Sequence, residues 1–115
     1  KKKHRLFQIE KVLLLKTVSI FKDTSEEILT EIASVVEEVD LKEGETVFEK
    51  GTEGDCMYVI FSGKVKVHDG DSIFAHLGDR DFFGELSLLD PEPRSASVTA
   101  IEDTFLLQLN QDVTN

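Results

Sequence analysis

The stretch FFGELSLLDPEPRSASV occupies residues 82–98. Gly84 lacks a Cβ, so its backbone can adopt a positive φ or come close to a ligand. Residues 85–89 favour a helix of only one or two turns, and the free N–H groups at the start of such a turn attract anions. Residues 90–93 predict a rigid loop, and Arg94 is expected to open a strand. The stretch therefore predicts an anion-binding turn between two strands.

Two charged residues in this stretch suggest which anion is bound. Arg94 carries a planar fork of donors that matches the oxygens of a phosphate. Glu85 offers a carboxylate acceptor that suits a sugar hydroxyl. A ligand with one phosphate charge and one free ribose hydroxyl satisfies both, whereas the alternative is an internal Glu85–Arg94 salt bridge. The glycine, the short turn and the proline loop around the pair favour the ligand.

Downstream of residue 40 the chain reads as short strands separated by glycines. The Asp69-Gly70 pair between two apolar runs predicts a tight hairpin with a positive φ at both turn positions. Many short strands at regular spacing indicate a closed barrel or jelly roll. The expected strands are 47–48, 56–61, 65–67, 73–75, 95–100 and 104–109.

The first forty residues read as helix. A short amphipathic segment covers residues 9–16, and a second helix is expected to start at Thr24, with Glu27 completing a capping box. We expect one domain over residues 1–115, with a helical segment at 1–40 and a barrel at 41–110 that contains the 83–98 stretch. The fold class is mainly β with flanking helices, a double-stranded β-helix. The apolar stripe of the second helix is Ile28, Leu29, Ile32, Val35, Val36 and Val39.

Charge and composition exclude several classes of protein. The net charge is −10, and residues 23–55 hold twelve acids against two lysines, so direct binding to nucleic acid is not expected. An anionic ligand must then be held by a local positive site. No apolar stretch has the roughly 18 residues that a membrane span needs. Cys56 is the only cysteine, which predicts a reducing cytoplasm and a core position rather than a reactive thiol. The start at Lys1 suggests a fragment of a longer protein.

These features resemble the cyclic-nucleotide-binding domains. The family's phosphate-binding cassette has Phe-Gly-Glu-Leu, a short helix, and Pro-Arg before small residues and valine, as at residues 83–98 here. A second block, GTEGDCMYVIFSGKVKV at residues 51–67, is similar to the family's Gly-x-x-Gly-Asp and Gly-x-Val-x-Val segment. Residues 15–40 resemble the helical segment that precedes the barrel. The resemblance covers nearly the whole chain.

The resemblance implies roles for individual residues. Glu85 and the Gly84 backbone match the pair that binds the ribose 2′-hydroxyl, and Arg94 matches the arginine that binds the exocyclic phosphate oxygens. The backbone N–H of Ser87 matches another donor to the phosphate. A threonine at the position of Ser95 favours cGMP in other members, so the serine here favours cAMP. Cassette neighbours and an apolar wall near the base complete the set, which is Gly84, Glu85, Leu86, Ser87, Arg94, Ser95, Ala96, Val65, Phe74 and Leu77.

Two features depart from the family pattern. Arg80 stands in the loop before the cassette, where many members have glycine. The C-terminal helix that closes over the base in the family is missing after Asn115.

The expected function is that of a cytoplasmic regulatory sensor, not an enzyme. It would bind cAMP or cGMP, need no cofactor or metal, and pass the signal to an effector domain on the same or another chain. One alternative is a family member that binds no nucleotide and acts as a protein-interaction module. The other is a cupin-like metal enzyme, which needs a His-x-His pair, whereas His4, His68 and His76 are far apart.

Overall fold

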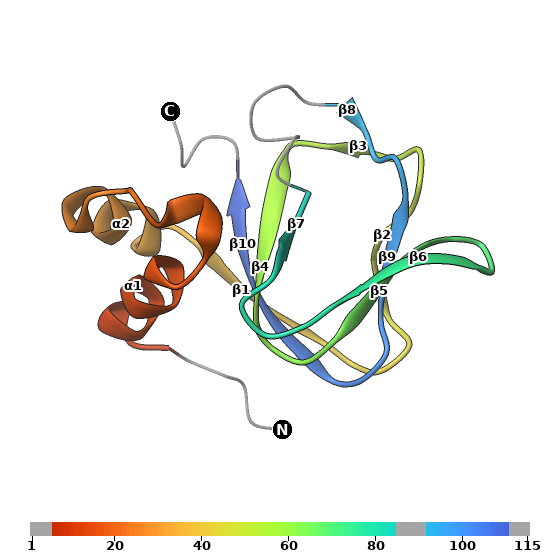
Figure 1. The fold of residues 1–115 in the computed structure, drawn as a ribbon, viewed down its shortest axis with the longest axis horizontal. Helices are drawn as coiled ribbons and strands as arrows, with labels where there is room; N and C mark the ends of the chain where they lie inside the picture. Colours follow the sequence, from red (N-terminus) through yellow and green to blue (C-terminus); the bar gives the residue numbers. More distant parts are fainter. Residues whose placement is uncertain (1–5, 85–91, 111–115) are drawn as a thin grey trace.

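The computed structural model of the chain describes residues 6–84 and 92–110. Two four-stranded antiparallel sheets face each other, and two helices cover the outside of one of them (Figure 1). This arrangement confirms the mainly β, jelly-roll fold class. The cassette helix expected after Gly84 lies outside the described residues.

The strands are ordered so that the chain crosses repeatedly between the sheets. The first sheet has the order β1 (Glu37–Leu41), β10 (Thr104–Asn110), β4 (Cys56–Ser62) and β7 (Phe82–Phe83). The second has the order β2 (Thr46–Phe48), β9 (Ser97–Ala100), β5 (Val65–Asp69) and β6 (Ser72–Leu77). A short third pair joins β3 (Glu53–Gly54) to β8 (Glu92–Pro93).

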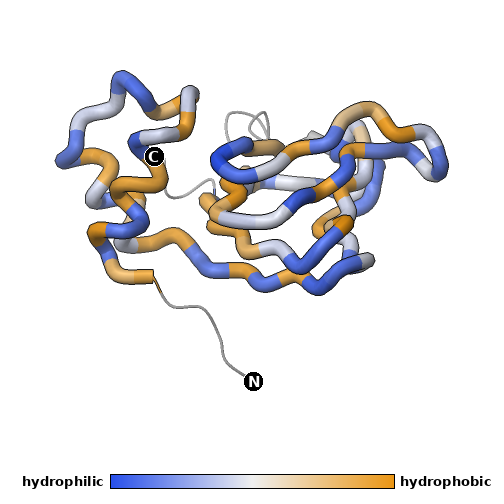
Figure 2. The backbone as a smooth tube through the Cα atoms, turned by 60° about the horizontal axis from the view of Figure 1, so that its bottom comes forward, coloured by the Kyte–Doolittle hydropathy of each residue, from blue (hydrophilic) through white to orange (hydrophobic). Residues whose placement is uncertain are grey.

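The sequence of strand β4 is apolar without a break because both faces of the strand are buried. Side chains alternate across a strand, and both faces of β4 are covered. Met57 and Val59 face the helices, where they pack with Leu107 of β10. Cys56, Tyr58 and Ile60 belong to the cluster between the two sheets. Figure 2, which colours the backbone by hydropathy, shows hydrophobic and hydrophilic residues mixed along both the helical layer and the barrel.

The helical layer consists of α1 (Gln8–Lys16), the 3₁₀ turn η1 (Ser19–Phe21) and α2 (Glu26–Ala33). The N-cap of α2 is Ser25, whose Oγ accepts a hydrogen bond from the Ile28 N–H at 3.3 Å. The helix thus starts one residue later than the Thr24 capping box predicts. Within residues 6–84 and 92–110, neither helix is long and apolar enough to cross a membrane.

The boundary between helix and barrel also lies earlier than predicted. Helix α2 ends at Ala33, and β1 starts at Glu37, so residues 37–40 are strand and Val39 pairs with Leu106 of β10. Of the expected helical stripe, Leu29 and Ile32 lie in α2 and are buried, whereas Val36 is buried but follows the end of the helix. Ile28 and Val35 are about half exposed, at 49% and 51%. The helical spacing of Val39 was a coincidence between two elements of different period.

The β5–β6 hairpin turns one residue later than predicted. Asp69 pairs with Ser72, which leaves Gly70 and Asp71 as the two turn residues. Only Gly70 has a positive φ, at 60°. A glycine at the first turn position is the pattern of a type II′ hairpin, which needs a positive φ only there.

Candidate functional site

Arg94 is fixed at one end of the barrel by its own backbone. It follows β8 directly, and its N–H donates to the Thr52 carbonyl at 2.7 Å. Its carbonyl accepts a hydrogen bond from the Gly51 N–H at 2.8 Å. Because β8 also pairs with β3, the loop of residues 49–54 holds the arginine before its side chain makes any contact.

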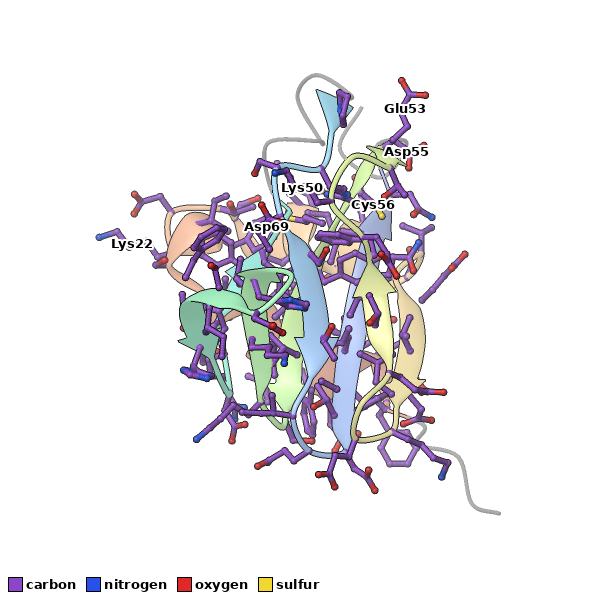
Figure 3. The ribbon with its side chains drawn as sticks, turned by 90° about the vertical axis from the view of Figure 1, so that its right-hand side faces the viewer. Lys22, Lys50, Glu53, Asp55, Cys56 and Asp69 are labelled. Atoms are coloured by element: carbon purple, nitrogen blue, oxygen red, sulfur yellow. The ribbon has the colours of Figure 1, made fainter. Side chains whose placement is uncertain are left out.

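The guanidinium of Arg94 lies in a slot and is buried, with 7% of the residue exposed. Its Nη2 donates to the Cys56 carbonyl at 2.9 Å and lies 3.6 Å from the Cys56 Sγ. Its Cζ lies 4.0 Å from the centre of the Phe48 ring, the geometry of a cation–π contact. Figure 3 shows Cys56 below Glu53 and Asp55 at this end of the barrel.

Two glycines make room for this slot. A Cβ on Gly54 would lie 2.1 Å from the Arg94 Nε, and a Cβ on Gly84 would lie 2.8 Å from Nη1. Gly84 also has a φ of 79°, which side chains rarely tolerate. The positive φ predicted for Gly84 is present, and its backbone lies beside the arginine, while the predicted approach to a ligand stays a prediction. Gly54 is needed for space alone, since its φ is not positive.

Three aromatic rings support the slot from the barrel interior. Phe48 lies 6.0 Å from Tyr58 and 5.9 Å from Phe83, and Tyr58 stacks on Phe83 at 5.2 Å. The Cys56 thiol donates a weak hydrogen bond to the Tyr58 hydroxyl at 3.5 Å. Burial, followed by this hydrogen bond, raises the pKa of Tyr58 well above its usual range. The floor of the slot is thus apolar and uncharged at neutral pH.

The other predicted phosphate contacts are placed in part. Ser95 is exposed and Ala96 is half-buried, and both lie in the bend between Arg94 and β9. The strand expected from residue 95 starts only at Ser97, whose Oγ accepts a hydrogen bond from the Lys50 N–H at 2.8 Å. This hydrogen bond turns Ser97 toward the neighbouring loop. Glu85, Leu86 and Ser87 lie outside the described residues.

Two of the three residues predicted to line the base come together. Val65 is fully buried, and it pairs directly with the half-buried Leu77. Both belong to the cluster between the sheets, which also contains Tyr58. Phe74 is 61% exposed and has no partner on β5, because the register skips from Ala75 to Ile73. The bulge separates Phe74 from the other two.

Cys56, His68 and His76 behave as ordinary structural groups. The thiol is free and buried, as its position in an apolar run predicted. His68 bridges the Gly70 carbonyl at 2.9 Å and the Thr99 hydroxyl at 2.8 Å, and His76 is exposed. The described part of the chain has no group of three side chains able to hold a metal ion.

Arg80 occupies the loop between β6 and β7 with a φ of 74°. Its N–H donates to the Ile60 carbonyl at 2.8 Å, and its Nη1 donates to the Phe61 carbonyl at 3.0 Å. Its Cζ lies 5.7 Å from the centre of the Phe61 ring. The loop has thus kept a left-handed conformation although an arginine stands there.

Sequence reasoning missed three residues of the slot. Phe48 was assigned only to a strand, Gly54 only to a motif, and Cys56 only to the core. The Gly-Asp pair at residues 54–55 was a usable signal for Gly54, because a glycine without a turn often marks a close approach. No pattern in the sequence places the Phe48 ring against a residue 46 positions away.

Comparisons with known proteins agree with this geometry. The family model described as a cyclic nucleotide-binding domain matches residues 38–115. The chain is 35% identical over 104 residues to a CRP-like cAMP-activated global transcriptional regulator of Mycobacterium tuberculosis, covering 86% of this chain and 46% of the regulator. It is 33% identical to a cGMP-dependent protein kinase of Toxoplasma gondii, over 86% of this chain and 10% of the kinase.

A solved structure extends the likeness to three dimensions. The regulatory domain of Toxoplasma gondii PKA, crystallised with cAMP, has a TM-score of 0.86 and 26% identity. The match covers 99% of this chain and 45% of that one. The chain therefore spans less than half the length of the regulator and of this solved chain.

Proposed function

Because the chain belongs to the cyclic nucleotide-binding domain family, we propose that it is the sensor of a longer regulatory protein. It binds a cyclic nucleotide by the phosphate and the ribose, with cAMP preferred over cGMP. The bound nucleotide then acts on an effector. The family itself is regulatory and not catalytic.

The observation that carries the proposal is the buried slot of Arg94. The protein has a net charge of −10, so an anionic ligand needs a local cation. A guanidinium fixed by Cys56 and Phe48 keeps its fork in one plane and loses little entropy when it binds a phosphate. Its burial lowers the local dielectric and strengthens each bond to the anion.

The remaining roles come from residues next to the slot. The Gly84 backbone lies beside the same guanidinium, and Glu85 is the next residue in the sequence. We assign Glu85 and the Gly84 backbone to the ribose 2′-hydroxyl, and Ser87 to the phosphate. Ser95, exposed beside Arg94, supports the preference for cAMP. Val65 and Leu77 form the apolar wall near the base.

The effector is proposed from the relatives. One is a transcriptional regulator and another a protein kinase, and each is much longer than this chain. The names of both relatives pair a cyclic nucleotide with transcriptional regulation or a protein kinase. We infer that this domain is likewise joined to an effector, on the same chain or on a partner.

A thermal shift tests the function. A ligand that binds only the folded state stabilises it by about 2.7 kcal/mol at a hundredfold excess over Kd. For a domain of this size, that is a rise of about ten degrees or more in the thermal midpoint. We expect this rise with cAMP and a smaller one with cGMP. A midpoint that millimolar cAMP and cGMP both leave unmoved would refute the proposal.

A second measurement tests the role of Glu85. Wild type and Glu85→Gln are each titrated with cAMP and 2′-deoxy-cAMP. If the carboxylate accepts the 2′-hydroxyl, wild type prefers cAMP, and the amide narrows that preference because it accepts a weaker bond. If Glu85 only holds Arg94, the variant weakens both ligands by the same factor. A coupling free energy near zero between the Glu85→Gln substitution and the loss of the 2′-hydroxyl would mean that Glu85 only forms a structural salt bridge with Arg94.

A further inference from the structure

We propose that Phe48 is a positioning residue for ligand binding: its ring holds the guanidinium of Arg94 in the plane that a phosphate requires. The inference rests on the function proposed above. Phe48 lies in strand β2, outside the phosphate-binding cassette, and is not among the residues predicted to contact the nucleotide.

The Phe48 ring lies against the flat face of the guanidinium. The Arg94 Cζ lies 4.0 Å from the ring centre, well inside the distance of about 6 Å for a cation–π contact. The Cys56 carbonyl fixes one edge of the fork through Nη2 at 2.9 Å. The ring against the face of the fork restricts its rotation out of that plane.

The ring is itself held rigidly. Phe48 contacts the stacked pair Tyr58 and Phe83, and its backbone pairs with Val98 of β9. The backbone of Gly54 lies beside the Nε of the guanidinium, and the backbone of Gly84 lies beside its Nη1. The side chain of Arg94 is therefore enclosed by a ring, a carbonyl and two backbones. The electrons of the ring can be changed by substitution while its shape stays nearly constant.

Fluorinated phenylalanines at position 48 test the proposal. Each added fluorine keeps the shape of the ring nearly constant and weakens the negative face that attracts a cation. Along the series Phe, 4-fluoro, 3,5-difluoro and 3,4,5-trifluoro, we expect the Kd for cAMP to rise stepwise, by about threefold to tenfold in total. A merely structural role of the ring predicts no trend, since size and apolar character are kept.

Phe61 provides the matched control. Its ring lies under Arg80 at 5.7 Å, so the same fluorinated series there weakens a cation–π contact outside the slot. We expect the Kd for cAMP to stay constant across the Phe61 series. The thermal midpoint of the ligand-free protein, measured for both series, shows that each variant is folded.

The outcomes distinguish the positioning role of Phe48 from the proposed binding of a cyclic nucleotide. A rising Kd in the Phe48 series with a flat Phe61 series supports the positioning role. A flat Phe48 series, or a Kd that falls as fluorines are added, overturns that role and leaves the nucleotide-binding function intact. If the unmodified protein binds neither cAMP nor cGMP, the proposed function fails, and the positioning role fails with it.

Discussion

Arg94 and Arg80 lie near opposite ends of strand β4 and make nearly the same contacts. Each donates a hydrogen bond to a carbonyl of that strand, Arg94 to Cys56 and Arg80 to Phe61. Each also lies over a phenylalanine ring, at 4.0 Å and 5.7 Å. Arg94 is buried and Arg80 is exposed. The contacts alone therefore do not distinguish a receptor for an anion from a surface arginine.

The surrounding backbone makes the difference. Around Arg94, the neighbouring residues Gly54 and Gly84 have no Cβ and so leave space for the guanidinium. At Arg80, the arginine's own backbone adopts an unusual conformation, with a φ of 74°. One region is shaped around a side chain, whereas the other tolerates a side chain in a loop shaped for glycine. The comparison teaches that the space left by Gly54 and Gly84 distinguishes Arg94, the arginine proposed to bind the phosphate, from Arg80.

The largest expected effect comes from filling that space. In Gly54→Ala the new Cβ would lie 2.1 Å from the Arg94 Nε, so the guanidinium must leave its position. We expect an approximately hundredfold rise in the Kd for cAMP, the loss of a charge-assisted hydrogen bond. Overpacking should also lower the free energy of unfolding by about 1–3 kcal/mol.

Gly78→Ala is the matched control near Arg80. Gly78 has an ordinary φ, and a Cβ there would lie 3.7 Å from the Gly63 carbonyl oxygen, a normal contact. We expect an unchanged Kd and a change in unfolding free energy within about 0.5 kcal/mol. Similar losses in the two variants, measured by calorimetric titration and urea unfolding, would mean that Gly54 has no special relation to Arg94.

A smaller effect tests the strain assigned to Arg80. Arg80→Gly and Arg80→Ala both remove the contacts with Phe61, but only alanine keeps a Cβ at a φ of 74°. We expect the glycine variant to be more stable than the alanine variant by about 1 kcal/mol, and cAMP affinity to be unchanged in both. Urea unfolding measures this difference. Equal stabilities would show that the loop relaxes freely around a side chain.

The sequence predicted elements well where one physical cause dominated. Strand β4 is apolar on both faces, and its expected range, 56–61, differs from the observed one by a single residue. Gly84 was predicted to allow a positive φ or a close approach to a ligand; its φ is positive, and its backbone lies beside the Arg94 guanidinium. Arg94, singled out for its fork and its setting, lies buried at the end of the barrel, and its contact with a phosphate stays a prediction.

Predictions failed where two causes overlapped. Val39 matched a helical stripe, yet pairing with β10 places it in a strand. The Asp69-Gly70 pair matched a hairpin turn, yet the register moved the turn to residues 70–71. Phe48 and Gly54 were not assigned to the site, because their relation to Arg94 depends on contacts between distant segments. Periodicity reports a residue's own element and not the side chain that will lie against it.

The most direct test of the account exchanges each arginine for lysine. Arg94→Lys and Arg80→Lys both keep the charge and lose the planar fork, so the pair isolates the geometry of the slot. The account predicts that the Kd for cAMP rises about tenfold to a hundredfold in Arg94→Lys and stays within about twofold in Arg80→Lys, with both proteins folded. Equal dissociation constants for the two variants would contradict it, because Arg94 would then bind the phosphate no better than an exposed arginine at the other end of the strand.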